Sequence, residues 1–141
     1  MTTQALRVGG VLETSLYVDD LSRAALFYSE IFGLQPLFRD SRLCAFDCGA
    51  GSVLLLFARG TTGETQKTPG GEIPPHEGEG RLHVAFAVAK DDLAAWEQRL
   101  GENGVAIEAR VNWPRGGESV YFRDPDANLV EIATPGLWAN Y

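Results

Sequence analysis

The order strand, helix and three strands occurs twice along this chain, and this repeat constrains the fold more than any other feature. Apolar and polar residues alternate over 11–18 (VLETSLYV) and again over 81–88 (RLHVAFAV), at the two-residue period of a half-buried strand. The repeat predicts a single α+β domain that consists of two βαβββ modules, at about 11–58 and about 81–134.

A helix is expected after each opening strand, over about 21–32 and about 93–100. Aspartates precede both helices as N-caps, and Gly33 and Gly101 stand where the helices are expected to end. After each helix we expect another extended stretch and then a pair of strands, at about 43–48 and 52–57 in the first module and about 119–123 and 128–133 in the second. Because each helix has one apolar face, we expect a curved, cup-shaped mixed sheet with the helices outside.

Composition limits the class of partner and the compartment. The 141 residues amount to one domain, and 45% are hydrophobic, which is enough for a core. Twelve Lys and Arg against 19 Asp and Glu give a net charge of −7. This balance argues against a nucleic-acid partner, because such binding depends on basic side chains. The chain shows no signal-peptide pattern and no apolar run of membrane-spanning length, so a cytoplasmic protein without membrane association is expected.

A crossover loop at 60–80 separates the two modules. It holds six glycines and three prolines in 21 residues, and long loops of this kind inside a domain are usually functional or mobile. We expect a flexible crossover that also lines a site. The loop contains His76, which is either solvated or reaches a pocket.

Three side chains with metal-binding chemistry share one face of the expected sheet. On the first strand of each module, Glu13 and His83 alternate with the apolar positions that pack against the helices. Glu131 does the same on the last strand, between Val130 and Ile132. If the modules form one cup, all three side chains point into its concave side.

Two carboxylates and one imidazole that converge predict a divalent-metal site, because paired carboxylates repel each other unless a cation, an arginine or a shared proton compensates them. Each residue also has a simpler interpretation. Glu131 is then an edge-strand carboxylate in water, His83 a hydrogen-bonded core histidine and Glu13 an ordinary exposed residue. The shared strand parity favours the metal site.

The sequence resembles the vicinal oxygen chelate superfamily over nearly its whole length. The resemblance is carried by the segments LETSLYVDDLSRAALFYSEIFGL, GRLHVAFAV and SVYFRDPDANLVEI, with Ala127 where the family usually has Gly. This superfamily includes glyoxalase I, extradiol dioxygenases, methylmalonyl-CoA epimerase, fosfomycin-modifying transferases and bleomycin-resistance proteins. The resemblance implies the tandem βαβββ fold described above.

The resemblance also implies where the metal ligands lie. Family positions fall on Glu13, His83 and Glu131, and the fourth position falls on Leu55, which cannot bind a metal. One ligand from the first module and two from the second match the fosfomycin-transferase-like pattern in position, although the first ligand there is ordinarily histidine. Short members commonly form homodimers, and the site then lies within one chain or is shared between two.

The leading interpretation is a metal-dependent enzyme that acts on a small substrate with two vicinal oxygens. The divalent metal ion is Mn, Fe, Co, Ni or Zn, and no general base is specified. We expect Tyr17, Leu55, Trp113 and Tyr121 at the substrate site, although half-buried strand or core packing is the alternative for the aromatic residues. The competing hypothesis is a metal-free protein that binds a drug or metabolite, as bleomycin-resistance-like members do.

Overall fold

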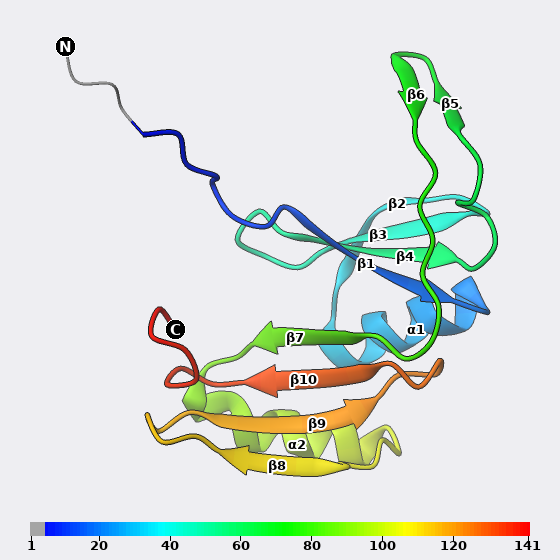
Figure 1. Ribbon diagram of the computed structural model, residues 1–141. Helices are drawn as coiled ribbons and strands as arrows, with labels where there is room; N and C mark the ends of the chain where they lie inside the picture. The colour runs from blue at the N-terminus through cyan, green and yellow to red at the C-terminus, as the bar shows by residue number, and fades with distance from the viewer. Residues whose placement is uncertain (1–4) are drawn as a thin grey trace.

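Two similar four-stranded sheets form the body of the protein in a computed structural model, which describes residues 5–141 (Figure 1). The first module contains β1 (Glu13–Val18), α1 (Leu21–Phe32), β2 (Gln35–Arg39), β3 (Leu43–Asp47) and β4 (Val53–Ala58). The second contains β7 (His83–Ala87), the single 3₁₀ turn η1 (Lys90–Asp92), α2 (Leu93–Glu102), β8 (Ala109–Asn112), β9 (Glu118–Arg123) and β10 (Leu129–Ala133).

The two sheets have equivalent topologies. Their strand orders are β1-β4-β3-β2 and β7-β10-β9-β8. In each sheet the first and last strands of the module pair in parallel, and the other pairs are antiparallel. The predicted α+β class with tandem βαβββ modules is therefore confirmed.

The expected single sheet is present as two separate sheets instead. The edge strands β1 and β7 do not pair with each other, and side chains of α1 connect the modules. Phe32 stacks on Phe86 with ring centroids 4.2 Å apart, and Phe27 lies 6.4 Å from Phe122. The helix of the first module thus packs against strands of the second, and one hydrophobic core includes residues of both modules.

The ends of the helices follow from local chemistry. Asp20 caps α1 by accepting a hydrogen bond from the Arg23 amide at 3.0 Å. Gly33 ends this helix in the left-handed region, with φ of 64°, which glycine adopts without steric cost. The second helix continues one residue past the expected stop at Gly101, to Glu102, and Asn103 is its C-cap.

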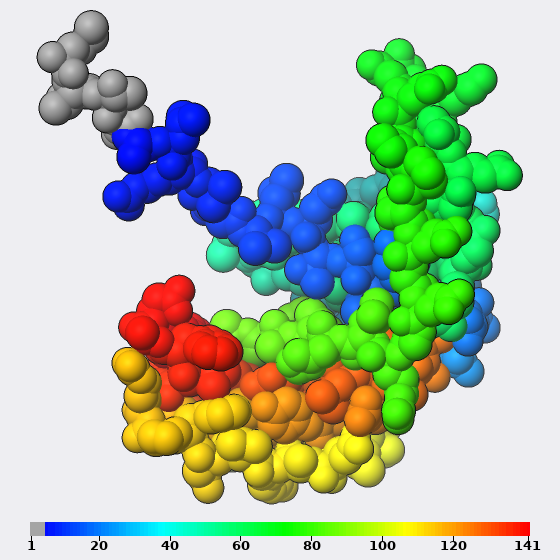
Figure 2. Space-filling model, in the orientation of Figure 1, coloured from blue at the N-terminus to red at the C-terminus, as the bar shows by residue number. Residues whose placement is uncertain are grey.

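The crossover loop is more ordered than the sequence suggested. It contains a short hairpin of β5 (Gln66–Thr68) and β6 (Gly71–Ile73), whose residues are all exposed. This hairpin projects from the body as an arm (Figures 1 and 2). None of the helices among the described residues is long and apolar enough to cross a membrane.

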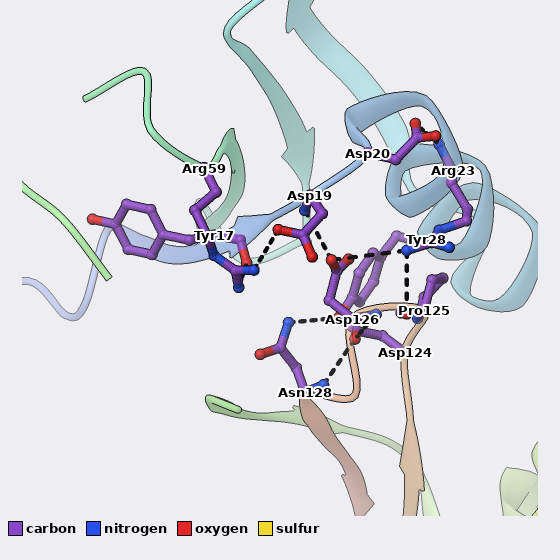
Figure 3. Close-up of polar contacts among 10 residues, drawn as sticks. All are labelled: Tyr17, Asp19, Asp20, Arg23, Tyr28, Arg59, Asp124, Pro125, Asp126 and Asn128. Atoms are coloured by element: carbon purple, nitrogen blue, oxygen red, sulfur yellow. Dashed lines mark hydrogen bonds and ion pairs between the residues drawn. The ribbon is translucent and has the colours of Figure 1, made fainter. Parts of the chain in front are cut away.

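A polar network joins the start of the first helix to the β9–β10 turn (Figure 3). The hydroxyl of Tyr28 donates to Asp124 Oδ2 at 2.7 Å, and the side-chain amide of Asn128 donates to the same oxygen at 2.9 Å. Asp126 in the turn accepts a hydrogen bond from the Asp19 amide at 2.8 Å. These contacts fix the position of one module relative to the other.

Ala127 in this turn has a φ of 62°. This left-handed conformation is unfavourable for residues other than glycine. Ala127, at the position where the family usually has glycine, therefore adopts a backbone conformation that glycine would adopt without steric cost.

Replacing Tyr28 by Phe is expected to lower the free energy of unfolding by about 1.5–3 kcal/mol at neutral pH, because a buried hydrogen bond to a carboxylate is lost. Burial, then the charge of Asp124 and the hydrogen bond to it, raise the pKa of Tyr28 well above 10.0. The folded state therefore holds the phenol proton more tightly than the unfolded state. The resulting stabilisation is complete below pH 10 and is lost as the pH rises further. Urea titrations from pH 7 to 11 should show a difference between parent and variant that shrinks above pH 10.

Candidate metal centre

His83 and Glu131 lie side by side on neighbouring parallel strands of the second sheet. Strand β10 places Glu131 opposite Ala85, two residues beyond His83, so both side chains project from the same face. Their atoms Nε2 and Oε1 are 3.2 Å apart. The histidine side chain is 49% exposed and the glutamate side chain 6%. The predicted pair is thus a buried carboxylate beside an accessible imidazole.

The contact of the second ring nitrogen, Nδ1, determines which nitrogen of His83 carries the proton in the neutral ring. Nδ1 lies 2.9 Å from the backbone carbonyl of Leu129. A carbonyl oxygen only accepts hydrogen bonds, so Nδ1 carries the proton and Nε2 of the neutral ring keeps a lone pair. This lone pair faces the carboxylate of Glu131, an arrangement that requires a cation or a second proton between the two atoms. The pair fits two ligand positions of a divalent metal, including the carbonyl contact that metal-binding histidines commonly make.

A hydrogen-bond relay holds the other oxygen of Glu131. Ser119 donates from Oγ to Glu131 Oε2 at 2.5 Å, and Trp113 donates from Nε1 to Ser119 Oγ at 2.8 Å. Both Ser119 and Glu131 are buried. Trp113, expected at the substrate site, therefore has its polar edge directed at the carboxylate through Ser119. Sequence reasoning did not select Ser119, although its place two residues before Tyr121 on one strand gives both the same face.

Tyr121 lies next to the pair of His83 and Glu131. It is opposite Glu131 in the antiparallel register of β9 and β10, and its ring centroid is 6.4 Å from that of His83. Burial, and then the charge of Glu131, raise the pKa of Tyr121. The phenol is therefore a neutral hydrogen-bond donor beside the pair at neutral pH.

Glu13 lies on the first sheet, away from the other two predicted ligands. It begins β1 and is exposed. Within the described part of the chain, no group of three His, Cys, Asp or Glu side chains is placed to hold a metal ion. The structure therefore brings together two of the three residues in one chain, because β1 and β7 belong to separate sheets.

The remaining predicted substrate residues, Tyr17 and Leu55, lie on the first sheet. Tyr17 is only 9% exposed, and its hydroxyl is 2.5 Å from Nδ1 of His76 in the crossover loop. Leu55 is half-buried in β4, between Ser15 and Ala45 of the adjacent strands. Neither residue lies in the sheet that contains His83.

Replacing Ser119 by Ala is expected to weaken divalent-metal binding by about 10–100-fold, because Glu131 loses the hydrogen bond that orients it. Isothermal titration with Mn²⁺ measures the change. Ser52→Ala, in the β3–β4 turn of the other module, is the matched control and should bind as the parent does. Equal affinities of the two variants would show that the relay does not orient a ligand.

The fold is that of proteins built from two βαβββ modules, and comparison with known proteins identifies the family. Residues 10–132 match the model of the Glyoxalase/Bleomycin resistance protein/Dioxygenase superfamily. The chain belongs to this superfamily, as its resemblance to vicinal oxygen chelate proteins predicted.

Similar proteins include transferases and a lyase. The metallothiol transferase FosB of Bacillus licheniformis is 27% identical over 94% of this chain and 79% of its own length. The glutathione transferase FosA of Serratia marcescens is 30% identical over 89% of this chain and 80% of its own. A crystal structure of lactoylglutathione lyase from Agrobacterium tumefaciens is 34% identical, covers 94% of this chain and 98% of its own, and has a TM-score of 0.85.

Proposed function

We propose that the protein is a metal-dependent enzyme that acts on a small substrate through two vicinal oxygens. The observation that carries this proposal is the approach of His83 Nε2 to 3.2 Å from the buried carboxylate of Glu131, with Nδ1 of the same ring held by the carbonyl of Leu129. A pure binding protein has no need to direct these two groups at one point. The names of the similar FosB and FosA proteins, a metallothiol transferase and a glutathione transferase, support the same class.

We further propose that a homodimer completes the site, with Glu13 of a second copy as the third ligand. Glu13 occupies the place in the first module that His83 occupies in the second, at the start of the parallel edge strand. It is exposed and makes no ion pair among residues 5–141. A carboxylate from the facing module also gives the site two negative charges, which match a divalent cation.

We assign a separate role at the site to each of the residues described above. His83 and Glu131 hold a divalent ion, and the relay from Ser119 keeps the carboxylate fixed. When bound, such an ion supplies Lewis-acid stabilisation of negative charge on substrate oxygens. Tyr121 stands beside the pair and donates a hydrogen bond to the same oxygens. Three protein ligands leave coordination positions open for the substrate.

Thiol transfer is the reaction that we favour within this class. The fourth ligand position that the family resemblance implies is occupied by Leu55, which has no donor atom. A site of three ligands, one from the first module and two from the second, matches the fosfomycin-transferase-like pattern. We therefore propose that a thiol is transferred to a small electrophile that chelates the metal through neighbouring oxygens.

The test combines metal analysis with a substrate screen. Protein purified without chelator should contain nearly one equivalent of Mn, Fe, Co, Ni or Zn per chain by elemental analysis. The metal-loaded protein should consume fosfomycin with cysteine or glutathione faster than the hemithioacetal of methylglyoxal, and chelator treatment should abolish turnover. Absence of metal, together with no thermal stabilisation by any of the five ions, would overturn the enzyme in favour of the metal-free binding protein.

A further inference from the structure

The base of the crossover arm is fixed against the first sheet, although its tip stands free of the body (Figure 2). The backbone amide of His76 donates to the carbonyl of Thr62 at 3.0 Å, and the Thr62 hydroxyl donates back to the carbonyl of His76. Thr62 is 4% exposed. Gly78 lies so close to the ring of Tyr17 that any side chain at this position would collide with it. The two ends of the arm therefore hold His76 in one place.

That place is the face of the first sheet that also carries Glu13. The ring of His76 meets Phe57 edge to face, with centroids 4.7 Å apart, and its Nδ1 contacts the hydroxyl of Tyr17. Phe57 and Tyr17 are neighbours in the register of β1 and β4. Glu13 and Tyr17 are four residues apart on one strand, so they share a face and are separated by about 13 Å. His76 thus covers the Tyr17 end of this face, and Glu13, the proposed third metal ligand, lies at the other end.

The contact with Tyr17 determines which nitrogen of His76 is available. Burial, and then the charge of Glu77, raise the pKa of Tyr17, so its phenol stays protonated. A protonated phenol donates to Nδ1 in the tautomer of His76 that carries its ring proton on Nε2, and this tautomer is the one the proposal uses. Among residues 5–141, Nε2 of His76 has no hydrogen-bond partner, and the side chain is only half-buried. A fixed donor is therefore left open beside Phe57.

We propose that His76 of the copy that supplies Glu13 contacts the substrate, donating from Nε2 to an oxygen at the end of the ligand remote from the metal, because Tyr17, which holds His76, lies about 13 Å along β1 from Glu13. Tyr17 acts through His76 as a positioning residue. The ligand class is an extended molecule with carboxylate or amide oxygens at its far end, rather than a compact one. This inference rests on the proposed function, because the metal anchors the other end of the ligand.

Two substitutions separate substrate contact from loop support. In His76→Asn, the side-chain amide replaces Nδ1 and keeps the contact with Tyr17, but it cannot reach the position of Nε2. In His76→Gln, the amide reaches the position of Nε2 and leaves Tyr17 without its partner. If His76 only supports the loop, His76→Asn should bind the ligand as the parent does and His76→Gln should bind it more weakly. If His76 contacts the substrate, His76→Gln should bind the ligand more tightly than His76→Asn.

The experiment uses full-length protein loaded with Zn²⁺ and glutathione as the extended probe, with fosfomycin as the compact one. The chain has two histidines, so ring NMR spectra resolve His76 from His83. Glutathione should shift the Nε2 resonance of His76, and fosfomycin should not. His76→Asn should weaken glutathione binding about tenfold, as expected for one hydrogen bond, with Zn²⁺ content unchanged, while His76→Gln stays within about twofold of the parent.

The results that would contradict this inference differ from the result that would contradict the proposed function. Zn²⁺ uptake with an unshifted His76 resonance, or with equal glutathione affinity in parent and His76→Asn, would overturn this inference alone. A loss confined to His76→Gln would assign His76 to loop support and would also overturn it. Failure of the parent to take up Zn²⁺ would overturn the proposed function, and this inference with it.

Discussion

Protein with Glu131 replaced by Gln is expected to lose nearly all bound divalent metal, with affinity reduced by at least about 100-fold. The loss should exceed the 10–100-fold typical of residues that only orient a ligand, because a ligand charge itself is removed. The amide has nearly the shape of the carboxylate, so Ser119 keeps a hydrogen-bond acceptor and the strand keeps its packing. The change therefore separates coordination from folding. Elemental analysis and Mn²⁺ titration of parent and variant measure it.

The matched control for this prediction is Glu72→Gln on the exposed hairpin of the crossover arm. It removes the same charge from the chain without touching the pair of His83 and Glu131. Thermal unfolding should show that both variants remain folded in the absence of metal. Full metal content in Glu131→Gln would mean that the buried carboxylate serves only to hold His83 and Ser119.

Local sequence patterns predicted most of this fold because they report on each element separately. The helix from Leu21 to Phe32 has its cap at Asp20 and its stop at Gly33, and both are adjacent to it in sequence. The alternation in 81–88 correctly placed Val84 inside and His83 outside. Whether β1 and β7 join into one sheet depends on contacts between modules, such as that of Phe32 with Phe86, which no local pattern encodes.

The same limit applies to the site. Strand parity was enough to place His83 and Glu131 on one face, because β7 and β10 are direct neighbours. The hydrogen bond from Trp113 to Ser119 depends on how the β8–β9 turn folds back, and the contact of His76 with Tyr17 depends on the path of a 21-residue loop. Side chains that come together through loops were the part that sequence reasoning did not resolve.

The separation of Glu13 from His83 within one chain makes the proposed dimer testable by subunit mixing. Glu13→Ala and Glu131→Ala should each bind little metal alone. If the site combines Glu13 of one copy with Glu131 of the other, each mixed dimer has one site that lacks both carboxylates and one that is intact, by two-fold symmetry. Random exchange of equal amounts should then restore about a quarter of the parent's metal content and turnover. Native mass spectrometry confirms that the mixed dimer has formed, and no recovery in its presence would show that Glu13 of one copy does not complete a site with Glu131 of the other.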